Sequence, residues 1–269
     1  MNTSIFAKGR ELVFGTQNKR KTLRFNTRMI PLETSLLNLD WGLHKYGVGL
    51  KINPVDWHIG DSFSLDIETD EKDGCVGFAC YSGSGEVFYF TPEFLTQTYI
   101  KTALLNGNLC GHNLKGDMQW LKGWGVNVNA TNLHYDTMIA SFVRDSSRQS
   151  HSLKLVAQDL LGYSWPTYKD IVGVGKKRLT LDKQPVELVA NYCGMDCFAT
   201  WKLMEYFNRN MTQNQKRIFN LEMDVNRILF EAECEGVFMD EAKLLSLKYK
   251  YEGEREEIKR HLQTLVQPQ

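Results

Sequence analysis

The stretch "FSLDIETD", residues 63–70, decides the fold, because it reads as a buried strand that carries two acids. Successive side chains of an extended chain point to opposite faces, so the apolar residues line one face while Asp66 and Glu68 share the other. The strand rise places these two carboxylates roughly 7 Å apart. Like charges at that spacing repel unless a cation is present or the face is fully wet. The stretch alone therefore leaves open a metal site and an ordinary surface strand.

The composition predicts a globular, soluble protein. The chain has 269 residues and a hydrophobic content of 42%, enough for a substantial core. Its formal net charge is zero, so a polyanionic partner would have to be met by local basic patches. The first thirty residues are rich in Lys and Arg, which favours a solvated tail and leaves nucleic-acid contact as the alternative.

The cysteines and the hydropathy indicate a cytoplasmic location. Six cysteines occur without a C-x-x-C pair, and we find no apolar leader at the N-terminus. This pattern predicts reduced thiols and argues against a zinc site or secretion. No run approaches the roughly 20 apolar residues of a membrane span, so we expect no membrane partner.

Hydrophobic periodicity predicts an α/β fold, a mixed sheet flanked by helices. Three short β-rich runs separated by turns read as a meander, and further strands alternate with helices after it. The expected strands are 62–68, 75–81, 87–90, "LCGH" and "LHYD", and the expected helices are 92–105, 114–122 and one that begins at residue 137.

The last third of the sequence is predicted to be mostly helical. "LKLVAQDLLG" is an amphipathic helix stopped by Gly162, and Pro185 fits the first turn of a helix over residues 185–208. Further helices are expected over residues 212–235 and after Asp240, a residue suited to an N-cap. We therefore divide the chain into an N-terminal region of unclear fold (1–60), an α/β domain (61–210) and a helical extension (211–269).

Two further acids lie in segments with apolar neighbours. In "GHNLKGDMQWL", Asn113 is suited to cap the next helix, which places Asp117 in its first turn; ordinary capping is the alternative to a functional role. In "YCGMDCFATW", Tyr192 and Asp196 are four residues apart and share one helix face. A buried carboxylate such as Asp196 needs a partner.

Four acids with partly buried surroundings predict a metal centre. Hard divalent cations accept oxygen ligands, and two ions about 4 Å apart can clamp both the attacking and the leaving oxygen of a phosphodiester. Two Mg²⁺ or Mn²⁺ ions would explain why the acids occur together. The predicted ligands are Asp66, Glu68, Asp117 and Asp196.

The motifs "LDIET", "HNLKGD" and "YCGMD" resemble, in this order, the three exonuclease motifs of the proofreading 3′-to-5′ exonucleases that use four acids and a tyrosine. The stretches between them resemble the exonuclease domain of family A DNA polymerases over about residues 62–208. Residues 219–240 resemble the segment that opens the polymerase domain of that family, and no palm or fingers motif follows. The resemblance implies a ribonuclease H-like fold and a metal-dependent exonuclease.

The resemblance also implies roles for single residues. Asp66, Glu68 and Asp196 would bind the metal ion that holds the attacking water, with Asp66 shared with a second ion that Asp117 helps to position. Tyr192 would orient that water, although a half-buried structural tyrosine is the alternative. Contacts to the nucleic acid are implied or suggested for Thr69, Asn113, Arg148, Tyr168, Lys176, Lys177 and Arg178, the last three and Arg148 being equally compatible with solvated loop charges.

One position departs from the family pattern. Gly116 precedes Asp117 where the family often carries an aromatic residue that touches the substrate strand. A missing stacking surface weakens single-strand binding by about 1–3 kcal/mol per base. We expect catalysis to survive this change and strand affinity to suffer.

We predict an exonuclease that releases nucleoside monophosphates from DNA, acting on single-stranded DNA or a frayed primer 3′ end. The alternatives are an RNA-trimming exonuclease of the same superfamily and a non-catalytic module that binds a primer terminus or a polymerase subunit. Apolar residues recur at helical spacing in residues 212–265, and packing of this stripe on the exonuclease domain is one interpretation. The resemblance to the start of a polymerase domain suggests instead that the stripe docks to a separate polymerase chain.

Overall fold

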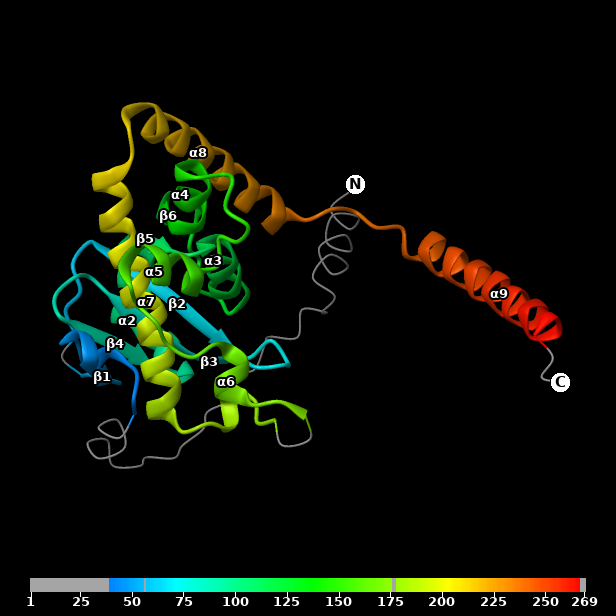
Figure 1. Ribbon diagram of the computed structural model, residues 1–269, viewed down its shortest axis with the longest axis horizontal. Coiled ribbons are helices and arrows are strands. Elements are labelled where there is room, and N and C mark those ends of the chain that lie inside the picture. Colours follow the sequence, from blue (N-terminus) through cyan, green and yellow to red (C-terminus); the bar gives the residue numbers. More distant parts are fainter. Residues whose placement is uncertain (1–38, 56, 176–177, 267–269) are drawn as a thin grey trace, which may run out of the picture. The chain divides into compact units, whose positions relative to one another are not determined.

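The structure is a computed structural model that describes residues 39–55, 57–175 and 178–266 (Figure 1). Of the described residues, those up to Glu231 belong to one compact unit, and those from Ala232 onward belong to a second. The predicted contacts Lys176 and Lys177, and most of the basic N-terminal segment, lie outside the described residues.

A six-stranded mixed sheet forms the centre of the first unit, with the strand order β1-β4-β3-β2-β5-β6. The predicted meander is confirmed, since β2 pairs antiparallel with β3 and β3 pairs antiparallel with β4. Strands β5 and β6 add to the other side in parallel register. The bounds are β1 (Gly49–Ile52), β2 (Ser62–Thr69), β3 (Cys75–Tyr81), β4 (Glu86–Phe90), β5 (Asn108–Gly111) and β6 (Leu133–Asp136).

Strand β1 comes from the region whose fold the sequence left open. It runs parallel to β4, with Gly49 opposite Glu86 and Ile52 opposite Tyr89. Just beyond this pairing, the Asn53 side chain donates to the Thr91 hydroxyl and accepts from the Thr91 backbone N–H, each at 2.9 Å. Residues 49–52 therefore complete the sheet, although their short, weakly alternating pattern gave no clear strand signal.

Helices cover both faces of the sheet, as predicted. On one face the hydroxyl of Ser64 donates to the Cys197 carbonyl at 2.9 Å, which places the even-numbered side chains of β2 against α7 (Val186–Asn210). On the other face Phe63 lies against Gly107, the residue that ends α2 (Thr98–Asn106). Figure 1 shows α7 crossing the sheet as one long helix.

The predicted helix over residues 92–105 is wrong in one respect, because it is two pieces. A 3-10 helix, η3 (Pro92–Thr96), precedes α2, and Gln97 between them is extended. The Thr-Gln-Thr run at this point has weak helix propensity, so the chain turns there. The remaining helices of this unit are η2 (Leu43–Tyr46), α3 (Leu114–Gly123), η4 (Ala130–Asn132), α4 (Thr137–Arg144), α5 (Leu153–Leu161), α6 (Tyr168–Val172) and η6 (Leu181–Lys183).

Helix α8 (Gln213–Glu235) packs one face on the edge strand β6. The rings of Phe219 and Tyr135 lie 4.6 Å apart, and Arg227 Nε donates to the Leu133 carbonyl at 3.1 Å. Phe230, from the same face, is fully buried. Arg227 thereby satisfies one backbone acceptor of the sheet edge.

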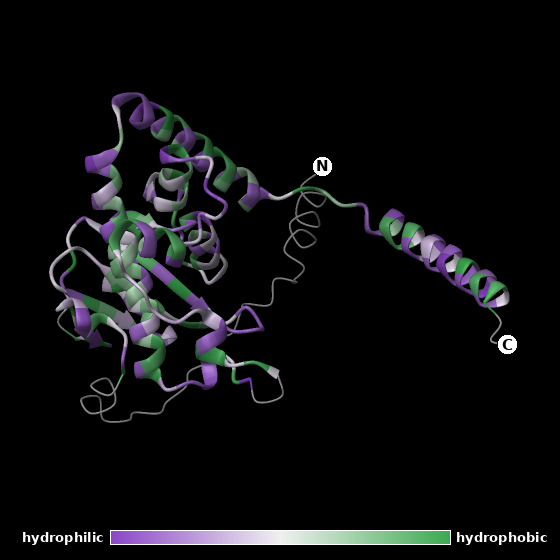
Figure 2. Ribbon diagram, viewed as in Figure 1, coloured by the Kyte–Doolittle hydropathy of each residue, from purple (hydrophilic) through white to green (hydrophobic). Residues whose placement is uncertain are grey.

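Helix α9 (Glu241–Leu265) begins at Asp240, whose side chain accepts a hydrogen bond from Lys243 N, as predicted for an N-cap. Hydrophobic and hydrophilic residues alternate along α9 (Figure 2). Over the part of the chain that the structure describes, no helix is both long and apolar enough to cross a membrane.

Candidate active site and metal centre

The two acids of β2 project toward α7, as the alternation of the strand requires. Asp66 and Glu68 are both half-buried, and the Cys193 thiol of α7 donates to the Asp66 carbonyl at 3.4 Å. One carboxylate oxygen each of Asp66 and Glu68 lies within 4.8 Å of the other and of the Cys193 sulfur. Two carboxylates therefore converge on one point of the sheet face.

The Cys193 thiol is a poor candidate for a metal ligand. Burial, followed by the charges of Asp66 and Glu68, raises the pKa of Cys193 well above the usual value of a thiol. The thiolate is the form that binds metals, and here it is disfavoured. The donor set is therefore dominated by carboxylate oxygens, which suit Mg²⁺ or Mn²⁺ better than zinc.

Asp196 lies one helix turn after Tyr192 on α7, and both residues are buried. The Oδ1 atom of Asp196 accepts hydrogen bonds from Lys154 Nζ and from Trp165 Nε1, each at 2.8 Å. Sequence reasoning missed both partners. The available signal for Lys154 was its position three residues before buried Ala157, on the inward face of α5.

Asp117 lies in the first turn of α3 and Asn113 occupies the N-cap position, both as predicted, but the Asn113 side chain does not form the cap. Asn113 adopts a left-handed conformation with φ 66°, and its side chain makes no capping bond to the described helix. Asp136, at the end of β6, accepts hydrogen bonds from Asn113 N at 3.1 Å and Leu114 N at 2.9 Å instead. A carboxylate buried at a helix N-terminus is stabilised by these donors, so it takes the place of a local side-chain cap.

The effects of the four acids on one another's pKa indicate that they form one cluster. Burial, followed by the charge of Asp196, raises the pKa of Asp66 to about 7. Burial, and then Asp66 and Asp196, raises the pKa of Glu68 well above its usual value, with a smaller effect of Asp117. Burial, followed by the charge of Asp66, raises the pKa of Asp117 well above its usual value. A backbone hydrogen bond with Ile67 lowers this pKa by a smaller amount.

The cluster fits a divalent cation. The Oδ2 atom of Asp66 is buried and has no hydrogen-bond partner among the described residues. A buried carboxylate oxygen without a donor is costly, and a cation relieves that cost together with the repulsion between the acids. Asp66, Glu68, Asp117 and Asp196 are therefore the residues that would hold metal ions.

Tyr192 remains a phenol in this environment. Burial, followed by the charges of Asp196 and Glu68, raises the pKa of Tyr192 above its usual range. The Lys154 ammonium lies 4.4 Å from the centroid of its ring. The hydroxyl thus keeps its proton and can donate a hydrogen bond beside the acids.

The residues suggested to contact nucleic acid differ in their exposure. Thr69 ends β2 and is half-buried, while Asn113 is exposed before α3. Tyr168 begins α6 and is 36% exposed; Arg178 Nη2 donates to its hydroxyl at 3.4 Å and also pairs with Glu71 at 3.1 Å. A stacking ring and a guanidinium thus lie together at the surface.

Arg148 and Gly116 lie in different situations. Arg148 makes an ion pair with Asp159 of α5 at 2.6 Å, and its side chain is only 16% exposed. A Cβ atom on Gly116 would meet only the Asn113 amide at 3.6 Å among its described neighbours, so the position has room for a side chain. The contacts of both residues with nucleic acid stay predictions.

Residues 57–212, more than half of the chain, match the family described as 3′-5′ exonuclease. The chain belongs to this family. The exonuclease resemblance inferred from the three motifs is thereby confirmed, and the matched residues include all four acids and Tyr192.

The curated relatives that the chain matches are longer proteins named DNA polymerase I. The chain is 28% identical over 148 residues to DNA polymerase I of Pseudomonas aeruginosa, covering 54% of the chain and 16% of that protein. It is 30% identical over 209 residues to DNA polymerase I of Synechocystis sp., covering 70% of the chain and 20% of that protein. The chain thus matches a fifth or less of the length of these relatives.

A solved structure supports the ribonuclease H-like fold. Brucella melitensis NrnC with bound Mg²⁺ superimposes with a TM-score of 0.51 at 14% identity, covering 72% of this chain and 100% of that one. At this identity the similarity concerns the fold alone. The predicted α/β class, with helices flanking a mixed sheet, is confirmed.

Proposed function

We propose that this protein removes nucleoside monophosphates from DNA 3′ ends, in the 3′-to-5′ direction. The observation that carries the proposal is the convergence of Asp66, Glu68, Asp117 and Asp196, with a buried Asp66 oxygen that lacks a partner among the described residues. DNA, and not RNA, is proposed as the substrate because the curated relatives are DNA polymerases.

Two divalent ions, Mg²⁺ or Mn²⁺, held by the four acids would activate the attacking water and stabilise the leaving oxygen. Residues of the chain orient the water and fix the position of the carboxylates. Tyr192 keeps its proton and can orient the water by a hydrogen bond from its hydroxyl. The Oδ1 atom of Asp196 is fixed by Lys154 and Trp165, which leaves its second carboxylate oxygen to bind an ion.

The substrate end should be unpaired. We propose that Thr69 and Asn113 contact the terminal nucleotides, that Tyr168 stacks on a base, and that basic residues, including Arg178, contact phosphates. Single-stranded or mismatched 3′ ends should then be cut faster than paired ends, because a frayed end costs less unpairing energy. These contacts support a role in proofreading.

The experiment follows the shortening of 5′-labelled oligonucleotides, in which the label stays on the remaining strand. Single-stranded DNA, matched and mismatched duplex DNA, and RNA are each incubated with Mn²⁺, and again with chelator. The proposal expects stepwise shortening of DNA that chelator abolishes. Faster cleavage of RNA than DNA would favour the RNA-trimming alternative, and intact substrates under all conditions would favour a binding module.

We propose residues 61–210 as the exonuclease domain and 211–269 as the start of a polymerase-like region. The outer face of α8 supports an interaction with a separate polymerase chain, because part of its apolar stripe does not pack on the exonuclease unit. Leu221 is 62% exposed and Ile228 is 66% exposed. Exposed apolar patches of this kind mark interaction sites.

Co-elution of the protein with a polymerase domain during sizing chromatography tests this interaction. The charge-introducing variant Leu221→Glu/Ile228→Glu should abolish co-elution and leave exonuclease activity intact. If the wild-type protein never co-elutes, the separate-chain proposal fails while the exonuclease proposal stands. The bacterial polymerase relatives also support a cytoplasmic location, tested by fractionating cells that express the protein.

A further inference from the structure

Lys154 places a basic side chain directly on the acid cluster. Its ammonium nitrogen lies 2.8 Å from Asp196 Oδ1, and the side chains of the pair are only 22% and 10% exposed. An ion pair this far from solvent is screened little by salt. Lys154 therefore interacts with the cluster as a charge and not merely as a surface group.

Two aromatic rings flank this ammonium group. The nitrogen lies 4.5 Å from the Trp165 ring centroid and 4.4 Å from the Tyr192 ring centroid. A cation over an aromatic face is attracted by the ring quadrupole. Trp165 also donates to the same Asp196 oxygen, so the lysine, the carboxylate and the rings form one arrangement.

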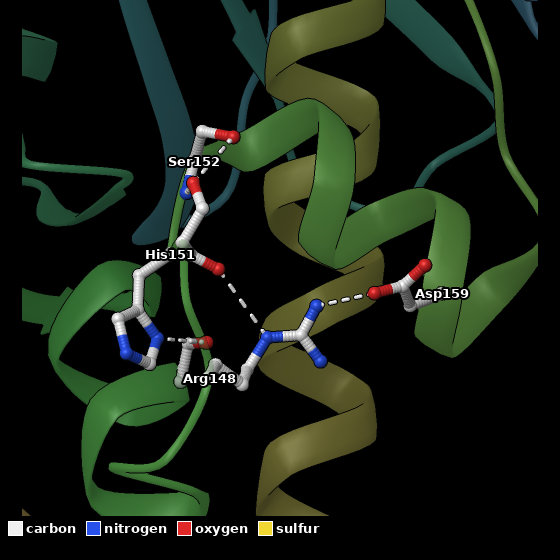
Figure 3. Close-up of polar contacts among 6 residues, drawn as sticks. Arg148, His151, Ser152 and Asp159 are labelled. Carbon is white, nitrogen blue, oxygen red and sulfur yellow. Dashed lines mark hydrogen bonds and ion pairs between the residues drawn. The ribbon is translucent and has the colours of Figure 1, made fainter.

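The helix that carries Lys154 is fixed from outside the site. In Figure 3 the Arg148 guanidinium lies between a carbonyl of its own loop and Asp159 of α5, with the ion pair at 2.6 Å. His112 Nε2 lies 2.8 Å from the His151 carbonyl in the same loop, and His151 Nδ1 lies 2.8 Å from Ser141 Oγ. These contacts tie the loop before α5 to β5 and α4.

The charge of Lys154 reaches beyond Asp196. It lowers the pKa of Asp66 and that of Glu68, against the larger raising effects of burial and of the neighbouring acids. The ammonium therefore compensates part of the repulsion that a bound metal ion would otherwise have to remove.

We infer that Lys154 is a built-in counter-cation, which neutralises the acid cluster before metal binds and competes with the metal for the negative charge of Asp196. It is a positioning residue, because it acts through Asp196 and Tyr192. This inference rests on the proposed function, since it assumes that the acids bind divalent ions. It goes beyond that function by assigning a thermodynamic role to a residue outside the four acids and the tyrosine.

The test is calorimetric titration of Mn²⁺ into metal-free protein, with thermal unfolding measured with and without Mn²⁺. Lys154→Met removes the charge and keeps most of the side-chain length. Lys154→Arg keeps the charge, and Lys101→Met removes one positive charge from α2 as the matched control.

Lys154→Met should bind Mn²⁺ about tenfold more tightly, because one positive charge within a few ångströms of the acids no longer opposes the ion. Its metal-free Tm should fall below that of the wild type, and its Tm gain with Mn²⁺ should be larger. Lys154→Arg and Lys101→Met should keep the wild-type Mn²⁺ affinity within about twofold.

Unchanged or weaker Mn²⁺ binding by Lys154→Met would overturn the inference, since a purely structural lysine leaves the affinity unchanged and a ligand-orienting lysine lowers it. If Lys154→Met fails to fold without metal but folds with Mn²⁺, the inference is supported. If it folds in neither case, Lys154→Gln replaces it in the same comparison. Absence of Mn²⁺ binding by the wild type would instead overturn the metal centre of the proposed function.

Discussion

The acid cluster at β2 buries charged groups, whereas the outer face of α8 exposes apolar groups. At the cluster, carboxylates are withdrawn from water, and Asp196 is bound by Lys154 and Trp165, two residues distant from it in sequence. On α8, apolar side chains such as Leu221 and Ile228 are left in water. This difference is the basis for proposing chemistry at the first region and contact with another chain at the second.

The largest effect is expected at the cluster. Asp66→Ala or Asp196→Ala should lower the rate of DNA cleavage by about 1,000-fold or more, because each removes a carboxylate that would hold a metal ion. The protein should stay folded, since the change also relieves repulsion between acids. Single-turnover cleavage and circular dichroism measure the two outcomes.

Asp61→Asn is the control for these variants, because Asp61 is an exposed acid that directly precedes β2. It should cleave at the wild-type rate. Wild-type rates in both cluster variants, in preparations free of host nuclease, would remove the acids from the active site.

The two faces of α8 can be compared directly. Phe230→Ala should lower the free energy of unfolding by about 3–5 kcal/mol, because it opens a cavity at a fully buried ring. Ile228→Ala, on the exposed face, should change it by less than about 0.5 kcal/mol. Urea unfolding measures both values, and equal losses would show that the outer face is already covered in solution.

Tyr192→Phe should slow cleavage by about 10- to 100-fold while single-strand affinity stays the same, because only the hydroxyl that orients water is lost. Single-turnover rates and DNA binding in the presence of Ca²⁺ separate the two quantities. Tyr206→Phe, at the other end of α7, is the matched control. An unchanged rate in Tyr192→Phe would make this tyrosine structural.

Gly116→Tyr should tighten single-stranded DNA binding by up to about tenfold, because it adds a ring on which a base can stack. The position has room, and it lies next to Asp117 at the start of α3. Gly116→Ala controls for the change in helix propensity. If the tyrosine variant binds no better than the alanine variant, the substrate strand does not pass this position.

The last prediction concerns the pH dependence of stability. The folded-state pKa of Asp66 is raised to about 7 by burial, so the folded protein keeps a proton that the unfolded chain loses near pH 4. The stability of the metal-free protein should therefore fall as pH rises from about 4 to about 7 and then level off. Asp66→Asn has no carboxyl group to titrate here, so its Tm advantage over the wild type should be about 5–10 °C larger at pH 8 than at pH 5.

Thermal unfolding in chelator, with Asp61→Asn as the control for loss of an acid, measures this difference. An advantage that is independent of pH would mean that the Asp66 carboxyl titrates normally in the folded protein.

Much of the candidate site follows from local periodicity. A period of two in β2 places Asp66 and Glu68 on one face, and a period near four in α7 places Tyr192 with Asp196. Because these relations hold within one element, the sequence determines them without knowledge of the fold. The carboxylate content then predicts a hard divalent metal.

Only the tertiary structure decided which groups meet those acids. Lys154 is 42 positions from Asp196, and Asp136 is 22 positions from the Leu114 amide that it binds. No pattern within either segment fixes such a pair, so the sequence suggested Asn113 as the cap and did not single out Lys154. The side chains of one segment have many possible partners, and only the packing of distant elements determines which partner each side chain meets.

The sequence by itself thus determined the strand and helix faces, the four acids with their tyrosine, and the family to which the chain belongs. The tertiary structure decided the position of β1 beside β4, the ion pair of Arg148 with Asp159, and which α8 side chains stay exposed. The physical reason is that a periodic pattern depends on backbone geometry alone, whereas burial and charge compensation depend on what packs against each face.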